Sequence, residues 1–387
     1  MKYRFIAILG GLLCCCTPAL FAYDVTDSFD VNAFGTVGVS TNDSDEIQFK
    51  VYPEQESSVE EGEFDFGLNT VLGLQARYQF SDALSFTTQG VARYKGRASW
   101  STDIDWAYLN YDTPWSLSLR AGKFRFPIFH SSELAFVGYS RLYTRPALSF
   151  YGIGGYEHLH GLQASYNTSI ERFDLAFQGS YGQSDNETPV RADGSFDKIE
   201  SDDIKILSTR FGNDQFWINL AYTRLNSEVT TVPPIRPAIR LGVTDISMWS
   251  AEWQFRVAGL VVDGGYGKGE VERFQPDEEL RYISLSYPVE SFTPYLLYSS
   301  KQFSDLPRLM PANPGAPPLP PPPPPPDASD LSDETYSIGF RYDFHHNLAL
   351  KCQLDHIKAG TRSRVSNNPT GERGTHNALS LVLDWMF

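Results

Sequence analysis

Two short clusters contain residue types that could carry out chemistry: His130-Ser131-Ser132, and the pair His158 and His160. A serine beside a histidine could supply a nucleophile and its base, but adjacent side chains on a strand point in different directions and nothing fixes a third member. The two other histidines share one strand face and could hold a metal ion, yet a third ligand is missing. We therefore expect ordinary structural histidines, no enzyme activity and no cofactor.

Basic residues form a second chemical pattern, because they recur on the polar faces of alternating segments. Leu68 to Phe80 carries apolar side chains at even positions from Leu72 onwards and polar ones at odd positions, and Leu84 to Gly96 alternates in the same way. Such charges act on ions through the electric field that they set up. The candidate residues on these faces and in the stretch that follows are Arg77, Arg93, Lys95, Arg97, Arg120, Glu133, Arg141, Arg145 and Glu157.

The stretch from Arg120 to Gly155 must position the later members of this set. Pro127 fixes its own φ and removes a ladder donor, so the strand that begins near Ser116 is predicted to leave the sheet there. The residues that follow interleave aromatic side chains with arginines, and something must cover their apolar faces. The inside wall of a wide barrel could do so. An ordinary packed loop of a soluble β protein is the alternative.

The N-terminus is predicted to be a secretory signal peptide over residues 1–22. Lys2 and Arg4 precede an apolar core, and small residues lead to a cleavage site after Ala22. A lipid anchor at Cys14–Cys16 is disfavoured, because the preceding residues lack the small side chains of a lipidation box. The mature chain, 23–387, would keep Cys352 as its one cysteine, so it can form no intrachain disulfide.

The net charge of −15 argues against nucleic acid as a partner. Removal of Lys2 and Arg4 leaves 30 basic against 47 acidic residues, which is a net charge of −17. After the signal peptide there is no apolar run of about 18 residues, so no membrane-spanning helix is predicted. Spanning strands stay possible, because each carries only a weak period-two pattern.

Two connecting segments have unusual composition. Thr41 to Glu63 is rich in carboxylates and is predicted to be a solvated loop, with a divalent-cation site as the weaker alternative. Residues 304–333 are predicted to be an extracellular loop whose proline run, which starts at Pro320, is an extended polyproline II spacer. A ligand for a proline-recognising domain is the alternative for that run.

The order of segments predicts the fold class. About sixteen alternating segments have the length that a tilted membrane strand needs, and their connections alternate between short turns and long loops. The short turns lie near Ser81, Asp112, Asn167, Asn213, Ala258, Pro288 and His345. A barrel in an outer membrane has its short and long connections at opposite ends. We therefore predict an all-β, transmembrane antiparallel barrel of about sixteen strands, with residues 127–156 as an inward-folded third extracellular loop.

The signal peptide, a final strand ending in Phe387, the LRAGKFRFP stretch and the long third loop together resemble the trimeric sixteen-stranded Gram-negative porins. The resemblance implies an outer-membrane homotrimer among lipid and lipopolysaccharide. Its last strand would be read through Phe387 by the barrel-assembly machinery, and small hydrophilic solutes would diffuse passively through it. It also implies that the third loop narrows the pore, with Arg77, Arg93, Lys95 and Arg120 as a basic ladder and Glu133 as its acidic counterpart.

The chain departs from this pattern in its inward loop, which contains Arg141 and Arg145 and few acids. In this it is similar to the anion- and phosphate-selective porins, whose filters are cationic, so a mild anion preference is expected, opposed by Glu133 and Glu157. Alternatively, the arginines pair with carboxylates across the lumen and have no selective effect. A substrate-specific channel, an outer-membrane barrel enzyme and a soluble β-sandwich binding protein are the other hypotheses.

Overall fold

The computed structural model describes residues 23–26, 28–52, 55, 59–96, 99–152, 156–188, 196–235, 237–272, 276–304, 332–360, 363, 366–367 and 373–387. Three predictions lie outside this part of the chain: the signal peptide over 1–22, most of the proline-rich loop, and the place of Arg97. The side chain of Lys95 also lies outside it.

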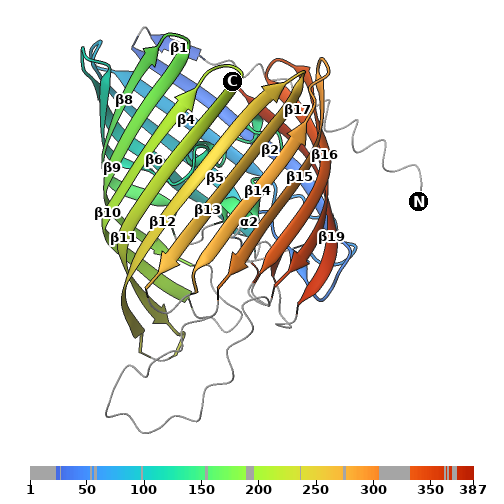
Figure 1. The fold of residues 1–387 in the computed structure, drawn as a ribbon. Coiled ribbons are helices and arrows are strands. Elements are labelled where there is room, and N and C mark those ends of the chain that lie inside the picture. Colours follow the sequence, from blue (N-terminus) through green and yellow to red (C-terminus); the bar gives the residue numbers. More distant parts are fainter. Residues whose placement is uncertain are drawn as a thin grey trace.

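One closed antiparallel barrel accounts for nearly all of the described residues (Figure 1). Sixteen strands of this part of the chain form its wall: β2 (Phe29–Asn42), β4 (Val71–Gln79), β5 (Leu84–Gly96), β6 (Ser99–Asp112), β7 (Leu117–Arg125), β8 (His158–Ile170), β9 (Phe173–Glu187), β10 (Phe196–Gly212), β11 (Phe216–Val232), β12 (Ile239–Val257), β13 (Leu260–Val271), β14 (Glu278–Ser286), β15 (Phe292–Phe303), β16 (Asp333–His345), β17 (Leu348–Ala359) and β19 (Gly374–Met386). Each pairs with its neighbours in chain order. The predicted fold class is confirmed.

The ladder closes where β19 pairs with β2. Leu381 lies opposite Val39 and Trp385 lies opposite Gly35, where a Cβ atom would overlap the Trp385 ring. Phe387 extends this ladder, since its N–H donates to the Ala33 carbonyl and its carbonyl accepts from the Ala33 N–H, both at 2.8 Å. Closure removes the free edges that a sheet in lipid cannot leave unpaired.

The seven predicted short turns are all present, and they lie at the end of the barrel drawn uppermost in Figure 1. Ala258 and Gly259 form a two-residue turn in which both residues have positive φ, as the tightest hairpins require. One boundary differs from the prediction, because β8 continues through Asn167 to Ile170 and its turn contains only Glu171 and Arg172. The polar residues Asn167 to Ser169 imitate a turn in sequence but pair with β9.

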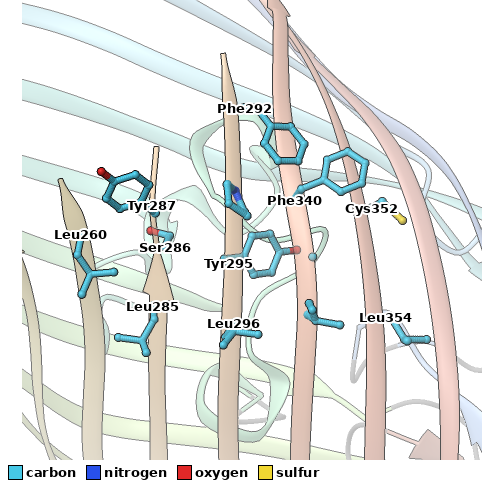
Figure 2. A pocket seen from close by; sticks show the side chains of 13 residues that line it. Leu260, Leu285, Ser286, Tyr287, Phe292, Tyr295, Leu296, Phe340, Cys352 and Leu354 are labelled. Atoms are coloured by element: carbon cyan, nitrogen blue, oxygen red, sulfur yellow. The ribbon is translucent and has the colours of Figure 1, made fainter. Parts of the chain in front are cut away.

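The wall alternates as the sequence predicts. On β4, Leu72 and Leu74 are exposed on the outer face, whereas Val71 is buried on the inner face. The outer face of β13 to β17 contains an apolar groove of about 580 Å³, lined by Leu285, Leu296 and other aliphatic and aromatic side chains (Figure 2). An apolar outer face and a mixed inner face are what a barrel in lipid requires. No helix within the described residues is long and apolar enough to cross a membrane.

Some short elements were not predicted. β1 (Tyr23–Thr26) pairs with β2, and β3 (Gln48–Phe49) pairs with β18 (Ser366–Asn367), which joins two of the long connections. The first long loop is also less solvated than predicted. Its carboxylates are interleaved with apolar side chains, which fold inward and are buried: Ile47, Phe49, Val51, Tyr52 and Val59.

The connection between β7 and β8 folds into the lumen, as predicted. It contains the short helices η1 (Ser132–Leu134), η2 (Gly138–Ser140) and α2 (Leu148–Tyr151). η2 lies against β2 and β19, whereas α2 lies against β14, β15 and β16. Figure 1 shows α2 within the outline of the barrel. We call residues 126–157 the inward loop. Residues 153–155 of this loop are not among those that the structure describes.

Candidate pore constriction

The inward loop starts where proline interrupts the ladder. The Phe126 N–H still donates to the Glu157 carbonyl at 3.1 Å, in line with the β7–β8 pairing. Pro127 has no N–H to continue that ladder, and the Ile128 N–H turns back to the Phe126 carbonyl at 3.0 Å. The sequence therefore dictates where the chain leaves the wall.

Two arginines of β7 hold the first part of the loop. Arg120 Nη1 lies 3.0 Å from Glu133 Oε1, and its guanidinium lies over the Tyr108 ring. Arg125 Nε donates to the Ser132 carbonyl at 3.1 Å, and its Nη1 lies 3.0 Å from Asp105 Oδ1 on β6. These contacts fasten η1 to the wall from which the loop departs.

A cluster of cations and one aromatic ring lies at the β5 side. Arg93 Nη2 is 3.1 Å from Glu157 Oε2, and the Arg93 side chain is almost fully buried. The guanidinium groups of Arg93 and Arg125 lie 4.5 and 4.4 Å from the centre of the Phe136 ring. Two cations can share this ring because Glu157 and Asp105 each compensate one of them. Ion pairs therefore link β5 to the end of the loop and β7 to its start, and a further pair joins β7 to β6.

The far side of the loop is bound to β16, β17 and β19. Lys351 Nζ donates to the Gly138 carbonyl at 2.8 Å and pairs with Asp384 at 2.7 Å. Arg341 Nη1 donates to the carbonyl of Arg141 at 2.9 Å. Further along, the Thr144 N–H donates to Gln353 Oε1, and Arg145 pairs with Asp355 at 3.1 Å in a fully buried contact.

A third wall, β12, holds the loop through one carboxylate. Glu252 Oε2 accepts from the His130 N–H at 2.6 Å and Oε1 accepts from the Tyr151 hydroxyl at 2.8 Å. Burial raises the pKa of the Tyr151 phenol well above its usual range, and the charge of Glu252 raises it further. Tyr151 therefore remains a hydrogen-bond donor. One side chain therefore ties residues from the start and the end of the loop to the wall.

Apolar packing fills the space between these polar anchors. One cluster joins Phe136, Val137 and Leu148 of the loop to inward side chains of β2, β4, β5, β17 and the first long loop. A second joins Phe129 and Phe150 to inward side chains of β6 to β8, β10 to β12, β14 and β15. The loop thus contacts opposite walls, and charged groups of the loop and of β5 to β7 pair beside these clusters.

The structure brings most of the predicted charged residues to the loop and separates one from it. Arg77 lies near the short turns, where its Nη2 donates to Gln79 Oε1 at 3.1 Å. Arg141 lies on the loop and donates to the Ala135 carbonyl and, at 3.4 Å, to the Tyr52 hydroxyl. The other predicted residues at the loop are Arg93, Arg120, Glu133, Arg145 and Glu157.

Other residues at the constriction were not predicted as a group. They are charged side chains on the inner face of the wall strands, and some of them bind residues of the inward loop. These residues are Asp105, Arg125, Glu252, Arg341, Lys351, Asp355 and Asp384. Their common sequence feature is an ionisable residue on the polar face of a strand far from the loop in sequence. That feature marks the inner wall but does not say which wall residues meet the loop.

The histidines of both clusters contact rings or carboxylates of nearby strands. The His130 ring packs 4.5 Å from the Trp217 ring, and Ser132 Oγ accepts from the Phe129 N–H. His158 Nε2 lies 2.8 Å from Asp105 Oδ1, whereas His160 lies 3.6 Å from Asp185. Within the described residues no group of three or more His, Cys, Asp or Glu side chains could hold a metal ion.

The family model described as "Gram-negative porin" matches residues 19–362 of the sequence, which is most of its length. The chain belongs to the Gram-negative porin family. This porin is therefore a protein of the bacterial outer membrane, and its transmembrane strands form the barrel described above. No curated protein sequence matches the chain.

Solved structures share the fold of this porin at low sequence identity. OmpT of Vibrio cholerae, in a trimer form, is 12% identical with a TM-score of 0.56, over 93% of this chain and 100% of that one. The anion-selective porin of Comamonas acidovorans is 12% identical with a TM-score of 0.54, over the same shares of the two chains. OmpF of Salmonella typhi, in complex with daunomycin, is 12% identical with a TM-score of 0.51, over 93% and 98%. At these identities the likeness concerns the fold alone.

Proposed function

We propose that this porin allows passive diffusion of small hydrophilic solutes and ions through the space that the inward loop narrows, with a mild preference for anions. The observation that supports this most is the loop itself, which is held inside a sixteen-stranded barrel by ion pairs at both sides. In a narrow lumen with low-dielectric walls, charges beside the path decide which ions pass.

The anion preference rests on a small imbalance of charge. Arg93, Arg120 and Arg145 are each paired with a carboxylate, which favours the alternative that the pairs cancel. Arg141 differs, because its described hydrogen bonds go to a carbonyl and a phenol, both neutral. In the part of the chain that the structure describes, no ion pair joins Arg141 to a carboxylate. The expected preference is therefore weak and depends on Arg141.

Reversal potentials across a potassium chloride gradient in planar bilayers test the proposal. A small shift towards the chloride potential is expected, and Arg141→Gln should abolish it while the protein still conducts. Lys358→Gln is the matched control, because Lys358 pairs with Glu334 on the outer face of the barrel. A clear cation preference of the wild-type channel would contradict the selectivity, and absent conductance would contradict the function.

We also propose a homotrimer that lies among lipid and lipopolysaccharide and is assembled through recognition of Phe387. Support comes from the trimer form of the Vibrio cholerae protein and from the position of Phe387 in the closing β19–β2 ladder. Unheated samples should migrate as trimers on denaturing gels. Deletion of Phe387 should lower the amount of assembled barrel in the outer membrane, whereas deletion that leaves it unchanged would remove the role of this residue.

A substrate-specific channel is the second candidate, and the apolar packing of the loop against opposite walls favours it. Solute flux that saturates with concentration would support it, and flux proportional to concentration would support general diffusion.

A barrel enzyme is disfavoured by the surroundings of His158. Its partner Asp105 also pairs with Arg125, and the hydroxyl of Ser184 donates to the backbone of His158. Hydrolysis of phospholipid or peptide substrates by purified protein would revive that hypothesis.

A further inference from the structure

A cavity of about 560 Å³ lies between the inward loop and the wall formed by β11 to β15. Phe129 and Tyr151 of the loop line one side, and Trp217, Gln254 and Asp263 line the wall. Its lining also includes Pro288, in the short turn between β14 and β15, so the cavity reaches the short-turn end of the barrel. Its volume is in the range of sites that hold small organic ligands.

Three polar side chains at this end form a prearranged group. Gln254 Nε2 donates to Asp263 Oδ1 at 2.7 Å. Gln254 Oε1 accepts from Arg256 Nε at 3.3 Å and from Arg256 Nη2 at 3.2 Å. The amide of Gln254 thus holds a guanidinium on one side and a carboxylate on the other, and keeps them from closing onto each other.

Each charged member of this group keeps an unused hydrogen-bonding atom. In the part of the chain that the structure describes, Arg256 Nη1 and Asp263 Oδ2 have no partner, and no ion pair joins the two residues. Arg256 is exposed and Asp263 is half-buried, so solutes in the cavity can reach both. Gln254 lies opposite Asp263, and Arg256 lies opposite Val261, so the two charges are diagonal neighbours on one face of the β12–β13 pair.

Aromatic side chains form a further part of the cavity surface, beside polar and charged residues that include Arg125, Arg141 and Glu157. The rings of Phe129 and Tyr151 lie 5.2 Å apart, and those of Tyr151 and Tyr282 lie 5.6 Å apart. Trp217 is next to Gln254 in the inward row, because the two residues are paired in register. A flat apolar group that packs against these rings would lose water-exposed surface without leaving a polar atom unpaired.

We propose that this cavity binds a small zwitterion with an aromatic or large apolar side group, such as a free α-amino acid or a dipeptide. The ligand carboxylate meets Arg256 and its ammonium meets Asp263, in charge-assisted hydrogen bonds. The side group packs against the aromatic surface. The inference rests on the proposed porin function, because such a solute would bind in this cavity, beside the constriction, on its way through the pore.

The two charges together select this ligand class over its relatives. A carboxylate without an ammonium group leaves Asp263 Oδ2 without a partner, and an amine without a carboxylate leaves Arg256 Nη1 without one. A polar group that gives up water without gaining a partner loses binding free energy. A neutral sugar matches neither charge.

The test uses isothermal titration of the purified full-length protein in detergent with four probes. L-phenylalanine should bind, 3-phenylpropionate and 2-phenylethylamine should each bind at least roughly tenfold more weakly, and glucose should show no binding. Equal affinity for the three phenyl compounds, or no binding of phenylalanine, would overturn the proposal. This comparison needs no variant, so it does not depend on any substituted protein folding.

Variants then locate the site. Arg256→Gln and Asp263→Asn should each weaken phenylalanine binding at least roughly tenfold. Arg77→Gln is the matched control, since Arg77 is also an inward arginine near the short turns that hydrogen-bonds a glutamine, but it lies on β4, away from the cavity. Its phenylalanine affinity should equal that of the wild type. Unchanged affinity in both cavity variants would show that the ligand binds elsewhere and overturn the assignment.

Conductance in potassium chloride, measured on the same preparation, separates this inference from the proposed function. A protein that conducts but shows none of the expected phenylalanine selectivity refutes the binding site and leaves the porin function intact. A protein that binds phenylalanine as expected but does not conduct refutes the passive pore and leaves the binding site intact.

Discussion

Lys351 Nζ and Asp384 Oδ2 are 2.7 Å apart, and both side chains are completely buried inside the barrel. The pair lies where η2 of the inward loop touches the wall. Lys351 also donates to the Gly138 carbonyl, and Thr36 Oγ1 donates to Asp384 Oδ1 at 2.5 Å. Because two desolvated charges are stabilised only while both stay fully hydrogen-bonded, this pair fixes the far side of the loop against β17 and β19.

Lys351→Met should detach this part of the loop. It leaves the Asp384 carboxylate buried without its cation, which costs about 3–5 kcal/mol of stability. We expect the barrel to unfold at a lower temperature, so that its mobility on denaturing gels changes after heating to a lower temperature than the wild type needs. We also expect a changed single-channel conductance. Lys358→Met is the control, because its pair with Glu334 is half-exposed on the outer face and contributes about 0–1 kcal/mol. Equal effects of the two substitutions would contradict a special role for the buried pair.

Gly138→Ala tests the same contact by shape. A Cβ atom at residue 138 would overlap the side-chain oxygens of Asp384 and Thr36, so the loop must move from the wall. Overpacking of this kind costs roughly 1–3 kcal/mol, and single-channel records should show altered or fluctuating conductance. Gly90→Ala is the matched control, since a Cβ atom on that β5 residue meets no atom within 4 Å. A Gly138→Ala channel with wild-type conductance would show that this contact does not position the loop.

Glu252→Gln should loosen the loop at the opposite wall. A glutamine keeps the volume but offers one oxygen in place of two, so either the His130 N–H or the Tyr151 hydroxyl loses its acceptor. Loss of a hydrogen bond to a charged group costs about 1.5–3 kcal/mol. Limited proteolysis should cut the loop faster than in the wild type. Glu334→Gln, on the outer face, serves as the control and should leave the cleavage rate unchanged.

The fold could be predicted from the sequence because its determinants are local. Period-two alternation on β4 and β5, turn residues such as Asn213, and Pro127 at the end of β7 each act within a few residues. Local reasoning fails at Asn167 to Ser169, whose polar side chains resemble those of a turn although the residues pair with β9. It also fails at Phe49, whose burial depends on parts of the barrel that are distant in sequence. Neither can be decided without the tertiary partner.

The constriction could be predicted only as a set of charges. Parity places Arg93 and Arg120 on the inner face correctly, because strand geometry alone decides it. Which acid each arginine meets depends on the path of the inward loop. Asp355 and Lys351 lie more than 200 residues from the loop residues that they contact, Arg145 and Gly138, so no spacing in the sequence links them. The ion pairs are consequences of barrel closure, which brings β17 and β19 round to β2.

The pair formed by Arg93 and Glu157 gives the sharpest test of selectivity, because the two residues join the wall to the end of the loop at 3.1 Å. Arg93→Gln removes one positive charge beside Glu157 and should shift the reversal potential towards cations. Glu157→Gln removes one negative charge beside Arg93 and should shift it towards anions. The double variant should lie near the wild type, because it removes equal and opposite charges. Shifts of the same sign in both single variants would show that loop displacement, and not local charge, governs which ions pass.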